Sequence, residues 1–377
     1  MAHSSTVLSQ IVRFFPRHEF QALAEKHHVG QKFRSFSRWT QFVAMLTAQL
    51  SNRSSLRDLI DNFGVQGSKF YHLGIKVFSR STLARCNEKQ PHTLYEELFK
   101  RLLGRCQSLA PRNKAFKLEG KIYLLDASLV ELTLSLFPWA KYQKKKGAAK
   151  LHIGLDADGY LPAFVDFTRG NEHEINRARE LELTKGSYVV FDRGYTDYSW
   201  YQELTEDGVF FVTRLKSNAV VTPGRKRRGR KSPGVLEDRE IRLGNLAETF
   251  RQITYLDKET DITYQFVTNA LDIPAQTVAD LYKERWQIEL FFKWIKQNLK
   301  VKSFLGTSMN AVKTQLWIAL CAYLVLSFLQ FQSKAKLSPQ RMLRILQLNL
   351  FERRDLWELF LPPKPRNSLQ NSQLCLI

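Results

Sequence analysis

Two short apolar segments of the chain each end in an aspartate. Residues 122–126 read IYLLD and end at Asp126, and residues 188–192 read YVVFD and end at Asp192. Such runs indicate central strands covered on both faces, and an acid at the carboxyl end of a strand lies where α/β folds place their sites. Neighbouring strands lie about 4.8 Å apart, so the two carboxylates could share a metal ion that offsets their repulsion. Aspartate also ends strands because it favours turns, and this simpler interpretation stays open.

A third acid lies on the helix predicted over residues 273–300, which has Pro274 in its first turn and Asp272 placed to cap it. At 100° per residue, one face carries an aromatic ring, a cation, an acid and a second cation within an arc of about 60°. These four residues are Tyr282, Arg285, Glu289 and Lys296. An apolar stripe runs alongside them, which puts them at the rim of the buried face. Arg285 and Glu289 alone would also suit an ordinary i,i+4 salt bridge worth about 0.3 kcal/mol.

The composition points to a polyanionic partner. The 377 residues carry 57 Lys and Arg against 36 Asp and Glu, a formal charge of +21, and an excess of that size favours nucleic acid. Charge alone would equally suit an anionic membrane surface or the ribosome. The four cysteines form no CxxC pair, which argues against structural zinc and a disulfide framework. Polar residues interrupt the apolar segment 314–331, so we interpret it as a buried core helix and not as a membrane span.

The first 110 residues are predicted to be largely helical, because apolar residues recur there at intervals of three and four. The clearest segments are 6–15, 38–50, 55–63 and a helix that begins near Ser81. Ser55 and Asp58 have the spacing of a capping box. Basic and aromatic residues such as Arg38 and Tyr71 accompany these helices, which suits a helix-turn-helix-like DNA reader. An ordinary helical bundle with a solvated basic surface suits the pattern equally well.

The central part of the chain changes to strand-forming patterns. Strands are predicted at 121–126, 150–156, 160–167, 187–192 and 208–213, with helical stretches at 173–182 and 197–206. The order predicts an α/β sheet with an antiparallel hairpin at one side, and the turn at 156–159 (DADG) suits that hairpin. Residues 214–272 are predicted as a β-rich insertion. It contains a basic loop suited to phosphate contact, at 223–231, and short strands near 250–256 and 262–270.

The four residues of the signature helix carry a family resemblance. Tyr282-x2-Arg285-x3-Glu289-x6-Lys296 resembles the Tyr-Arg-Glu-Lys signature of DDE transposases of bacterial insertion sequences, of the insertion-sequence-four type. Asp126 in LLDAS and Asp192 in VFDRGYTDY resemble the first and second aspartates of that family. The resemblance covers roughly residues 115–315, and the helical N-terminus is similar to the family's DNA-binding region.

The resemblance implies a ribonuclease-H-like α/β catalytic core with a β-rich insertion, flanked by helical N-terminal and C-terminal domains. The 97 positions from Asp192 to Glu289 leave room for the insertion. On this basis we expect four regions along the chain. They are a helical DNA-binding domain at 1–77, a helical linker at 78–115, the catalytic domain at 116–312 with its insertion at about 214–272, and a helical C-terminal region at 313–377 with a poorly ordered tail from about Leu361.

The resemblance also implies the chemistry. Asp126, Asp192 and Glu289 would hold two Mg²⁺ ions, with Mn²⁺ as a substitute, for in-line attack on phosphodiesters. Four residues are expected to contact DNA: Tyr282, Arg285, Lys296 and Arg193. The implied partners are double-stranded DNA, as the inverted repeats of the element ends and as target DNA, and a second copy of the chain in a dimeric synapse. We expect a cytoplasmic, nucleoid-associated bacterial protein with no membrane partner.

The chain departs from the family pattern at one aromatic residue. Some relatives carry a Trp in the insertion that stacks on a flipped base during hairpin formation, but no Trp lies between Trp200 and Trp286. Phe250, Tyr255 and Tyr264 are the aromatic substitutes available. Cut-and-paste transposition is therefore predicted, and the sequence leaves open whether cleavage passes through a hairpin.

Other residues have plainer interpretations, and two other functions stay open. Trp286 and Trp294 are interpreted as packing residues, and His152 and His173 as strand-end or cap residues. The alternative functions are another ribonuclease-H-like DNA nuclease, such as a junction resolvase, and a non-catalytic DNA-binding protein derived from a transposase.

Overall fold

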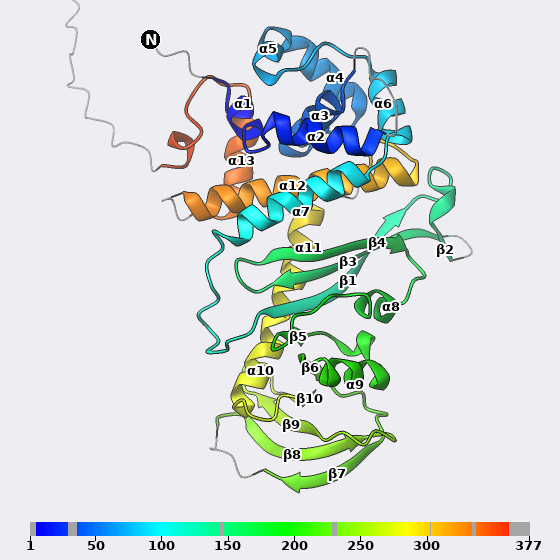
Figure 1. The fold of residues 1–377 in the computed structure, drawn as a ribbon, viewed down its shortest axis with the longest axis vertical. Helices are drawn as coiled ribbons and strands as arrows, with labels where there is room; N and C mark the ends of the chain where they lie inside the picture. The colour runs from blue at the N-terminus through cyan, green and yellow to red at the C-terminus, as the bar shows by residue number, and fades with distance from the viewer. Residues whose placement is uncertain are drawn as a thin grey trace, which may run out of the picture.

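The computed structural model describes residues 5–28, 36–143, 146–227, 232–301, 303–333 and 337–361. The chain forms an elongated molecule with helices at one end, a sheet in the middle and a group of long antiparallel strands at the other end (Figure 1). The tail expected from Leu361 and part of the basic loop, 228–231, lie outside the described residues.

The helical end is built from both termini of the chain (Figure 1). Its helices are α1 (Val7–Val12), α2 (Arg17–His28), α3 (Arg38–Leu50), α4 (Leu56–Val65), the 3-10 helix η1 (Gly67–Lys69), α5 (Phe70–Leu73), α6 (Arg80–Lys89), α7 (Thr93–Gln107), α12 (Met309–Gln332), α13 (Pro339–Asn349) and η4 (Glu358–Phe360). Ser55 caps α4 by accepting from the Asp58 amide, as its spacing predicts. Since α12 packs against α3, α6 and α7, N-terminal and C-terminal helices share one core.

The long apolar segment is the centre of that core. Helix α12 is long and apolar enough to cross a membrane by composition, yet 89% of its apolar window is buried inside the protein. A helix that is apolar all round belongs inside a large core or a membrane. Its burial among the neighbouring helices supports the core interpretation.

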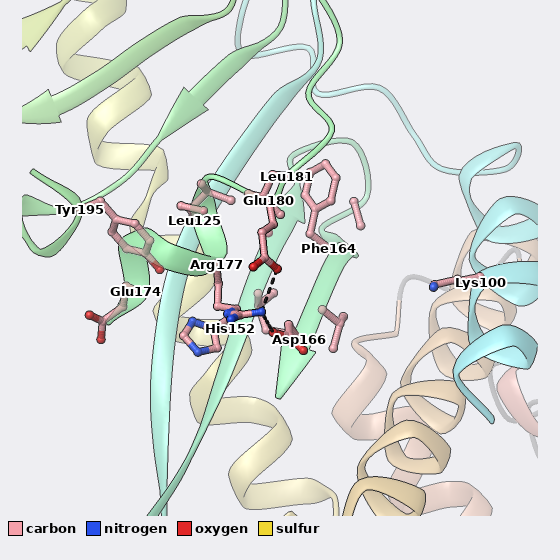
Figure 2. Close-up of a pocket in the computed structure, with 15 residues that line it drawn as sticks. Lys100, Leu125, His152, Phe164, Asp166, Glu174, Arg177, Glu180, Leu181 and Tyr195 are labelled. Atoms are coloured by element: carbon pink, nitrogen blue, oxygen red, sulfur yellow. Dashed lines mark hydrogen bonds and ion pairs between the residues drawn. The ribbon is translucent and has the colours of Figure 1, made fainter. Parts of the chain in front are cut away.

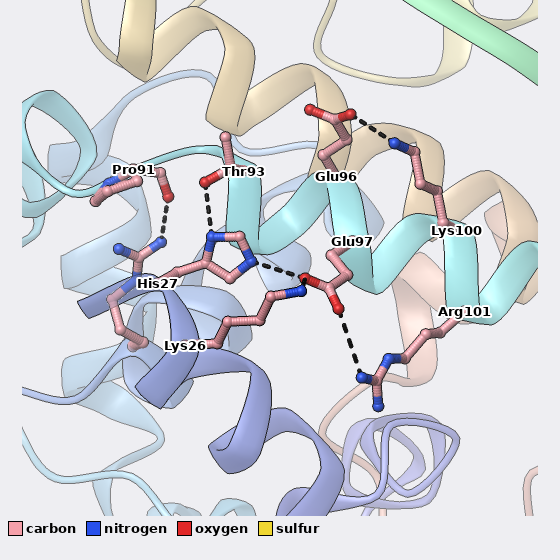
Figure 3. Close-up of polar contacts among 9 residues, drawn as sticks. Lys26, His27, Pro91, Thr93, Glu96, Glu97, Lys100 and Arg101 are labelled. Carbon is pink, nitrogen blue, oxygen red and sulfur yellow. Dashed lines mark hydrogen bonds and ion pairs between the residues drawn. The ribbon is translucent and has the colours of Figure 1, made fainter. Parts of the chain in front are cut away.

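Charged side chains fasten α2 onto α7 on the surface of this helical end (Figure 3). Glu97 accepts from Lys26 Nζ and His27 Nε2, both at 2.9 Å, and hydrogen bonds from these two side chains lower the pKa of Glu97 to about 2. Arg38 is only 1% exposed and donates from Nη2 to the Pro91 carbonyl at 2.6 Å. Arg38, one of the basic residues expected to suit a DNA reader, is therefore a structural residue.

The sheet has the strand order of a ribonuclease-H fold over its first half. Strands β4, β3, β1, β5 and β6 lie side by side in that order, with β3 antiparallel to both neighbours and β1, β5 and β6 parallel. Their bounds are β1 (Ile122–Leu132), β3 (Lys146–Asp156), β4 (Leu161–Arg169), β5 (Tyr188–Val190) and β6 (Phe210–Arg214), and a short strand β2 (Lys141–Gln143) lies on β3. The predicted ribonuclease-H-like core is thus confirmed.

The insertion continues the same sheet and does not form a separate one. Strand β10 pairs with β6, and the antiparallel strands β9, β8 and β7 follow in order. Their bounds are β7 (Val221–Lys226), β8 (Val235–Leu243), β9 (Phe250–Asp257) and β10 (Ile262–Thr268). The first part of the predicted basic loop, from Pro223 to Lys226, therefore belongs to strand β7.

Two elements differ from the sequence prediction. Strand β1 continues past Asp126 to Leu132, because its second half keeps pairing with β3. The helix predicted over 273–300 is two helices, α10 (Ala275–Glu284) and α11 (Trp286–Asn298), which meet at Arg285. The Arg285 amide donates to Tyr282 at 3.2 Å, three residues back, and such tight turns break α-helical geometry. Pro274 itself occupies the N-cap, without a side-chain cap from Asp272.

Candidate active site

Both predicted aspartates lie on the sheet face that α11 covers. Side chains alternate between the two faces of a strand, and Leu124 and Val190 belong to the core on the α11 side. Asp126 and Asp192 each follow two residues later, so they point toward that face. Asp192 comes two residues after β5 ends, and its Oδ1 accepts from the Gly194 amide at 2.7 Å. The two acids therefore stand on neighbouring parallel strands, as the sequence predicts.

The electrostatics show that the third acid lies close to this pair. The pKa of Asp126 is raised to about 6, chiefly by burial. A hydrogen bond from the Ala127 amide opposes this rise, the charge of Asp192 adds to it, and the charge of Glu289 adds to it as well. The charge of Arg285 acts in the opposite direction. The structure thus brings Asp126, Asp192 and Glu289 into one electrostatic neighbourhood.

Two cations fix the helix that carries Glu289. Arg285 donates from Nη2 to Glu289 Oε1 at 2.6 Å. About two turns after Glu289, Lys296 Nζ donates to Ser128 Oγ at 2.5 Å and to the Leu129 carbonyl at 3.0 Å. Helix α11 is therefore tied to β1 just beyond Asp126, which positions Glu289 over the sheet.

The donor chemistry of this site suits a hard divalent cation, because three carboxylates supply only oxygen ligands. A raised carboxyl pKa in a cluster of like charges also marks a place where a cation would be stabilising. In this conformation, however, no three acidic, His or Cys side chains among the described residues are gathered tightly enough to hold a metal ion. One oxygen of Glu289 is engaged by Arg285, so joint ligation by all three acids requires the acids to move closer together than they are in this conformation.

Tyr282 is a buried platform for two guanidinium groups. Its residue is 8% exposed, and its ring packs on Phe266 with centroids 5.0 Å apart. The guanidinium carbons of Arg285 and Arg214 each lie 5.5 Å from the centre of that ring. The Tyr282 hydroxyl is buried as well, so neither its ring nor its polar edge is open to DNA in this conformation, and its visible role is to orient two cations.

Arg214 is a residue that the sequence reasoning missed. It ends β6, the strand next to β5, and its guanidinium also lies 5.4 Å from the ring centre of Tyr264. The segment FFVTR ends in a charged residue as YVVFD ends in Asp192, and this repeated pattern could have indicated it. We therefore add Arg214 to the candidate DNA-contacting residues.

The exposed side of the site carries one cation and one aromatic ring. Arg193 is exposed directly after Asp192, as its predicted role requires. Trp286, interpreted from the sequence as a packing residue, is 56% exposed on α11 beside Arg285. Exposed indoles stack on nucleobases, so the sequence interpretation of Trp286 is wrong. Trp294 does pack, against Tyr323 at 5.2 Å.

The aromatic residues considered for the insertion are committed to packing. Phe250 is fully buried. Tyr255 and Tyr264 both pack against Phe266, with ring centroids 6.2 and 5.8 Å away. Phe250 is therefore closed to a flipped base, whereas Tyr255 and Tyr264 are half-buried.

The two histidines lie apart from this site. His152 lines a cavity of about 250 Å³ between the β3–β4 hairpin and α8 (Glu174–Ala178), together with Arg177, which pairs with Glu180 (Figure 2). Its Nε2 bonds Thr168 Oγ1 at 2.8 Å, and burial lowers the pKa of His152 to about 4. His173 occupies the N-cap position of α8. His173 is thus a cap residue, as the sequence suggests, whereas His152 lies in the middle of β3 and not at a strand end.

The raised pKa of Asp126 predicts that this carboxylate destabilises the metal-free protein. The folded state keeps the proton up to about pH 6, whereas an unfolded Asp loses it near pH 3.8. Stability therefore falls between these values as pH rises, by on the order of 3 kcal/mol. We expect Asp126→Asn to be more stable than the parent by about that amount in urea unfolding at pH 7.5 with EDTA. The gain in stability should vanish at pH 4. A stability difference between Asp126→Asn and the parent that is the same at both pH values would contradict the raised pKa of Asp126.

Comparison with known proteins adds the family. A family model described as "Transposase DDE domain" matches residues 117–325, more than half of the chain. The chain belongs to the DDE transposase family. A relative from Sinorhizobium fredii that is named as a transposase is 34% identical over 292 residues, which cover 74% of this chain and 80% of the relative. The matched residues run from just before β1 into α12 and include all three acids.

Further relatives bear transposase names too. A chain of Geobacillus stearothermophilus named for insertion sequence element IS5377 is 28% identical over 84% of this transposase and 82% of its own length. A piggyBac transposase, solved as a synaptic complex with hairpin DNA, aligns over 98% of this chain and 88% of its own, with 11% identity and a TM-score of 0.48. That likeness is too distant to inform on chemistry. Residues 3–76 of the transposase match a model described as a domain of unknown function.

Proposed function

We propose that this chain is the transposase of a bacterial insertion sequence, which binds the inverted repeats at the element ends, cleaves phosphodiesters there and joins the ends to target DNA. The proposal rests on the placement of three acids. Asp126 and Asp192 lie on one face of a ribonuclease-H-like sheet, and Glu289 lies near them on the helix that covers this face. Membership of the DDE transposase family and the charge of +21 support it.

In this proposal the three acids are the catalytic and metal-binding residues for two Mg²⁺ ions, with Mn²⁺ as a substitute. When bound, such ions activate a hydroxyl nucleophile and stabilise the leaving oxygen. The chain itself positions the DNA. Arg193 binds phosphate at the exposed rim. Arg285, whose side chain is 13% exposed, binds phosphate after it leaves Glu289, and Tyr282 holds it in orientation. Lys296 is held by β1 in the absence of DNA, and we propose that it exchanges this contact for a phosphate.

The wider organisation is proposed on the same basis. Residues 1–77 form the DNA-binding domain, 78–115 the linker, 116–312 the catalytic domain and 313–377 the C-terminal region. A homodimer holds two element ends in one complex. The protein acts on the bacterial nucleoid in the cytoplasm. Two alternatives remain, another ribonuclease-H-like nuclease and a non-catalytic DNA-binding protein derived from a transposase.

A mobility assay tests this function in cells. A resistance marker is placed between the inverted repeats that flank the coding region, and the chain is expressed from a separate plasmid. We expect excision and reinsertion of the marker, with both ends cut at the repeats. Cleavage of branched DNA without any mobility of the marker would favour the nuclease alternative, and DNA binding without cleavage would favour the non-catalytic one.

A further inference from the structure

We propose that a groove between helices α4 and α6 binds the sugar–phosphate backbone of double-stranded DNA. The proposal rests on the proposed function, because it names a DNA-contacting surface of the transposase away from the acids. The groove is an open hollow of about 930 Å³. One wall is the start of α4, the other is the exposed face of α6, and Phe304 and Leu305 line it from the loop between α11 and α12.

The groove lining carries more positive than negative charge. Its lining includes four exposed cations and one acid: Arg57, Arg80, Arg85, Lys89 and Glu88. Within the part of the chain that the structure describes, none of the four cations has a carboxylate within 4.0 Å. Cations left unpaired in a concave site are placed to bind an anion, and guanidinium groups match phosphate geometry in two hydrogen bonds.

Helix α7 provides the contrast. Its cations are each paired with an acid: Lys100 with Glu96 at 2.8 Å, Arg101 with Glu97 at 3.5 Å and Arg105 with Glu19 at 2.5 Å. Neutralised cations of this kind form an ordinary solvated surface. The α4–α6 groove therefore differs from α7 in gathering, around one hollow, four cations with no acid partner among the described residues.

The shape of α6 suits close approach by a DNA strand. Leu83 and Cys86 are buried and attach the helix to the core, whereas Ser81 and Ala84 are exposed between the cations. These small side chains leave space at the centre of the wall while Arg85 extends beside them. A convex phosphate backbone fits a hollow whose cations stand at its sides, and backbone contacts of this kind set the position of a protein on DNA.

The loop at the edge of the groove is fixed to the helix that carries Glu289. It begins where α11 ends, and buried Gln315 clamps it by donating to the carbonyls of Lys300 and Ser303 and accepting from the Leu305 amide at 2.8 Å. The Lys300 amide donates to Gln49 of α3 at 2.8 Å. A duplex held in the groove is therefore held in a fixed relation to the catalytic helix.

The test measures the affinity of the full chain for a fluorescein-labelled DNA duplex of about 30 bp and arbitrary sequence. Fluorescence anisotropy gives this affinity at KCl concentrations from about 50 to about 300 mM. The groove variant is Arg57→Gln with Arg85→Gln, one arginine from each wall. The matched control is Arg341→Gln with Arg344→Gln, two exposed arginines on α13. Each lost phosphate contact lowers the salt slope by about 0.9. We expect the groove variant to lose a slope of about 2 and to bind roughly 10- to 60-fold more weakly at 0.1 M salt, and the control to match the parent.

A second variant is expected to change the DNA affinity in the opposite direction. Glu88→Gln removes the one acid in the groove lining, so we expect tighter binding, which a misfolded protein would not show. The proposal is overturned if the groove variant binds DNA as tightly as the control, or if the parent does not bind the DNA duplex. It is also overturned if the groove variant loses affinity only for an RNA duplex. Cleavage of the element ends is scored separately. If the groove variant binds and cleaves like the parent, the groove proposal alone is refuted. If the groove variant binds more weakly but the parent does not cleave the element ends, the catalytic proposal alone is refuted.

Discussion

Glu289→Gln is expected to reduce metal-dependent cleavage of element-end DNA by about 10³-fold or more while DNA binding persists. Losing one anionic ligand of a catalytic metal site removes several kcal/mol of transition-state stabilisation. The amide keeps the size of the side chain and still accepts a hydrogen bond from Arg285, which lies 2.6 Å away in the parent. Single-turnover cleavage of a labelled duplex in Mg²⁺ measures the effect, and Asp192→Asn should behave in the same way.

The matched control for this prediction is Glu284→Gln on the preceding helix. Glu284 accepts from the Tyr160 hydroxyl at 2.5 Å and from Asn113 at 3.3 Å, and it is not among the main groups that shift the pKa of Asp126. We expect its cleavage rate to stay within several-fold of the parent. Full activity of Glu289→Gln, or equal losses in both variants, would contradict the placement of Glu289 in the catalytic site.

Arg251→Met is expected to destabilise the protein by about 3–5 kcal/mol, because it leaves a buried carboxylate without its partner. Arg251 is 4% exposed and binds both oxygens of Asp238, at 2.9 and 2.7 Å. Its Nη1 also donates to the Ile273 carbonyl at 2.5 Å and to that of Leu271 at 3.3 Å. It thus joins strands β8 and β9 of the insertion to the segment that starts α10. Urea unfolding gives the free energy of the change.

The partner of this ion pair supplies the control. In Arg251→Met with Asp238→Leu, no buried charge is left alone, so much of the lost stability should return. Arg242→Met changes an exposed arginine of β8 and should have little effect. A loss below about 1 kcal/mol in Arg251→Met, in the range of an exposed pair, would show that the pair does not hold the insertion in place.

The parts of the site that the sequence predicts well are those determined by local pattern. Apolar runs that end in Asp126 and Asp192 predict neighbouring parallel strands, and helical periodicity places Glu289 beside Arg285. The first depends on the residue types that form buried strands, and the second on the contact between residues four apart in a helix. Both features are therefore present in the fold. The extension of β1 beyond Asp126 was not predictable in this way, because it follows from pairing with β3.

Other features required the tertiary structure. Arg214 reaches the site only because β6 lies beside β5 and its guanidinium stacks on two tyrosines. The exposure of Trp286 depends on which side of α11 faces the sheet, and local sequence does not determine that. Arg38 shows the same limit, because a basic residue in a helix does not reveal whether it faces solvent or the core.

Cleavage by the purified chain tests the central claim most directly. A labelled duplex that carries an inverted repeat from beside the coding region is incubated with the full chain in Mg²⁺, with a parallel reaction in EDTA, and the cut positions are mapped to the nucleotide. The account predicts a break at the outer end of the repeat that appears only with the metal ion and is absent with Asp126→Asn. Cleavage in EDTA, or the same metal-dependent break with Asp126→Asn, would contradict it.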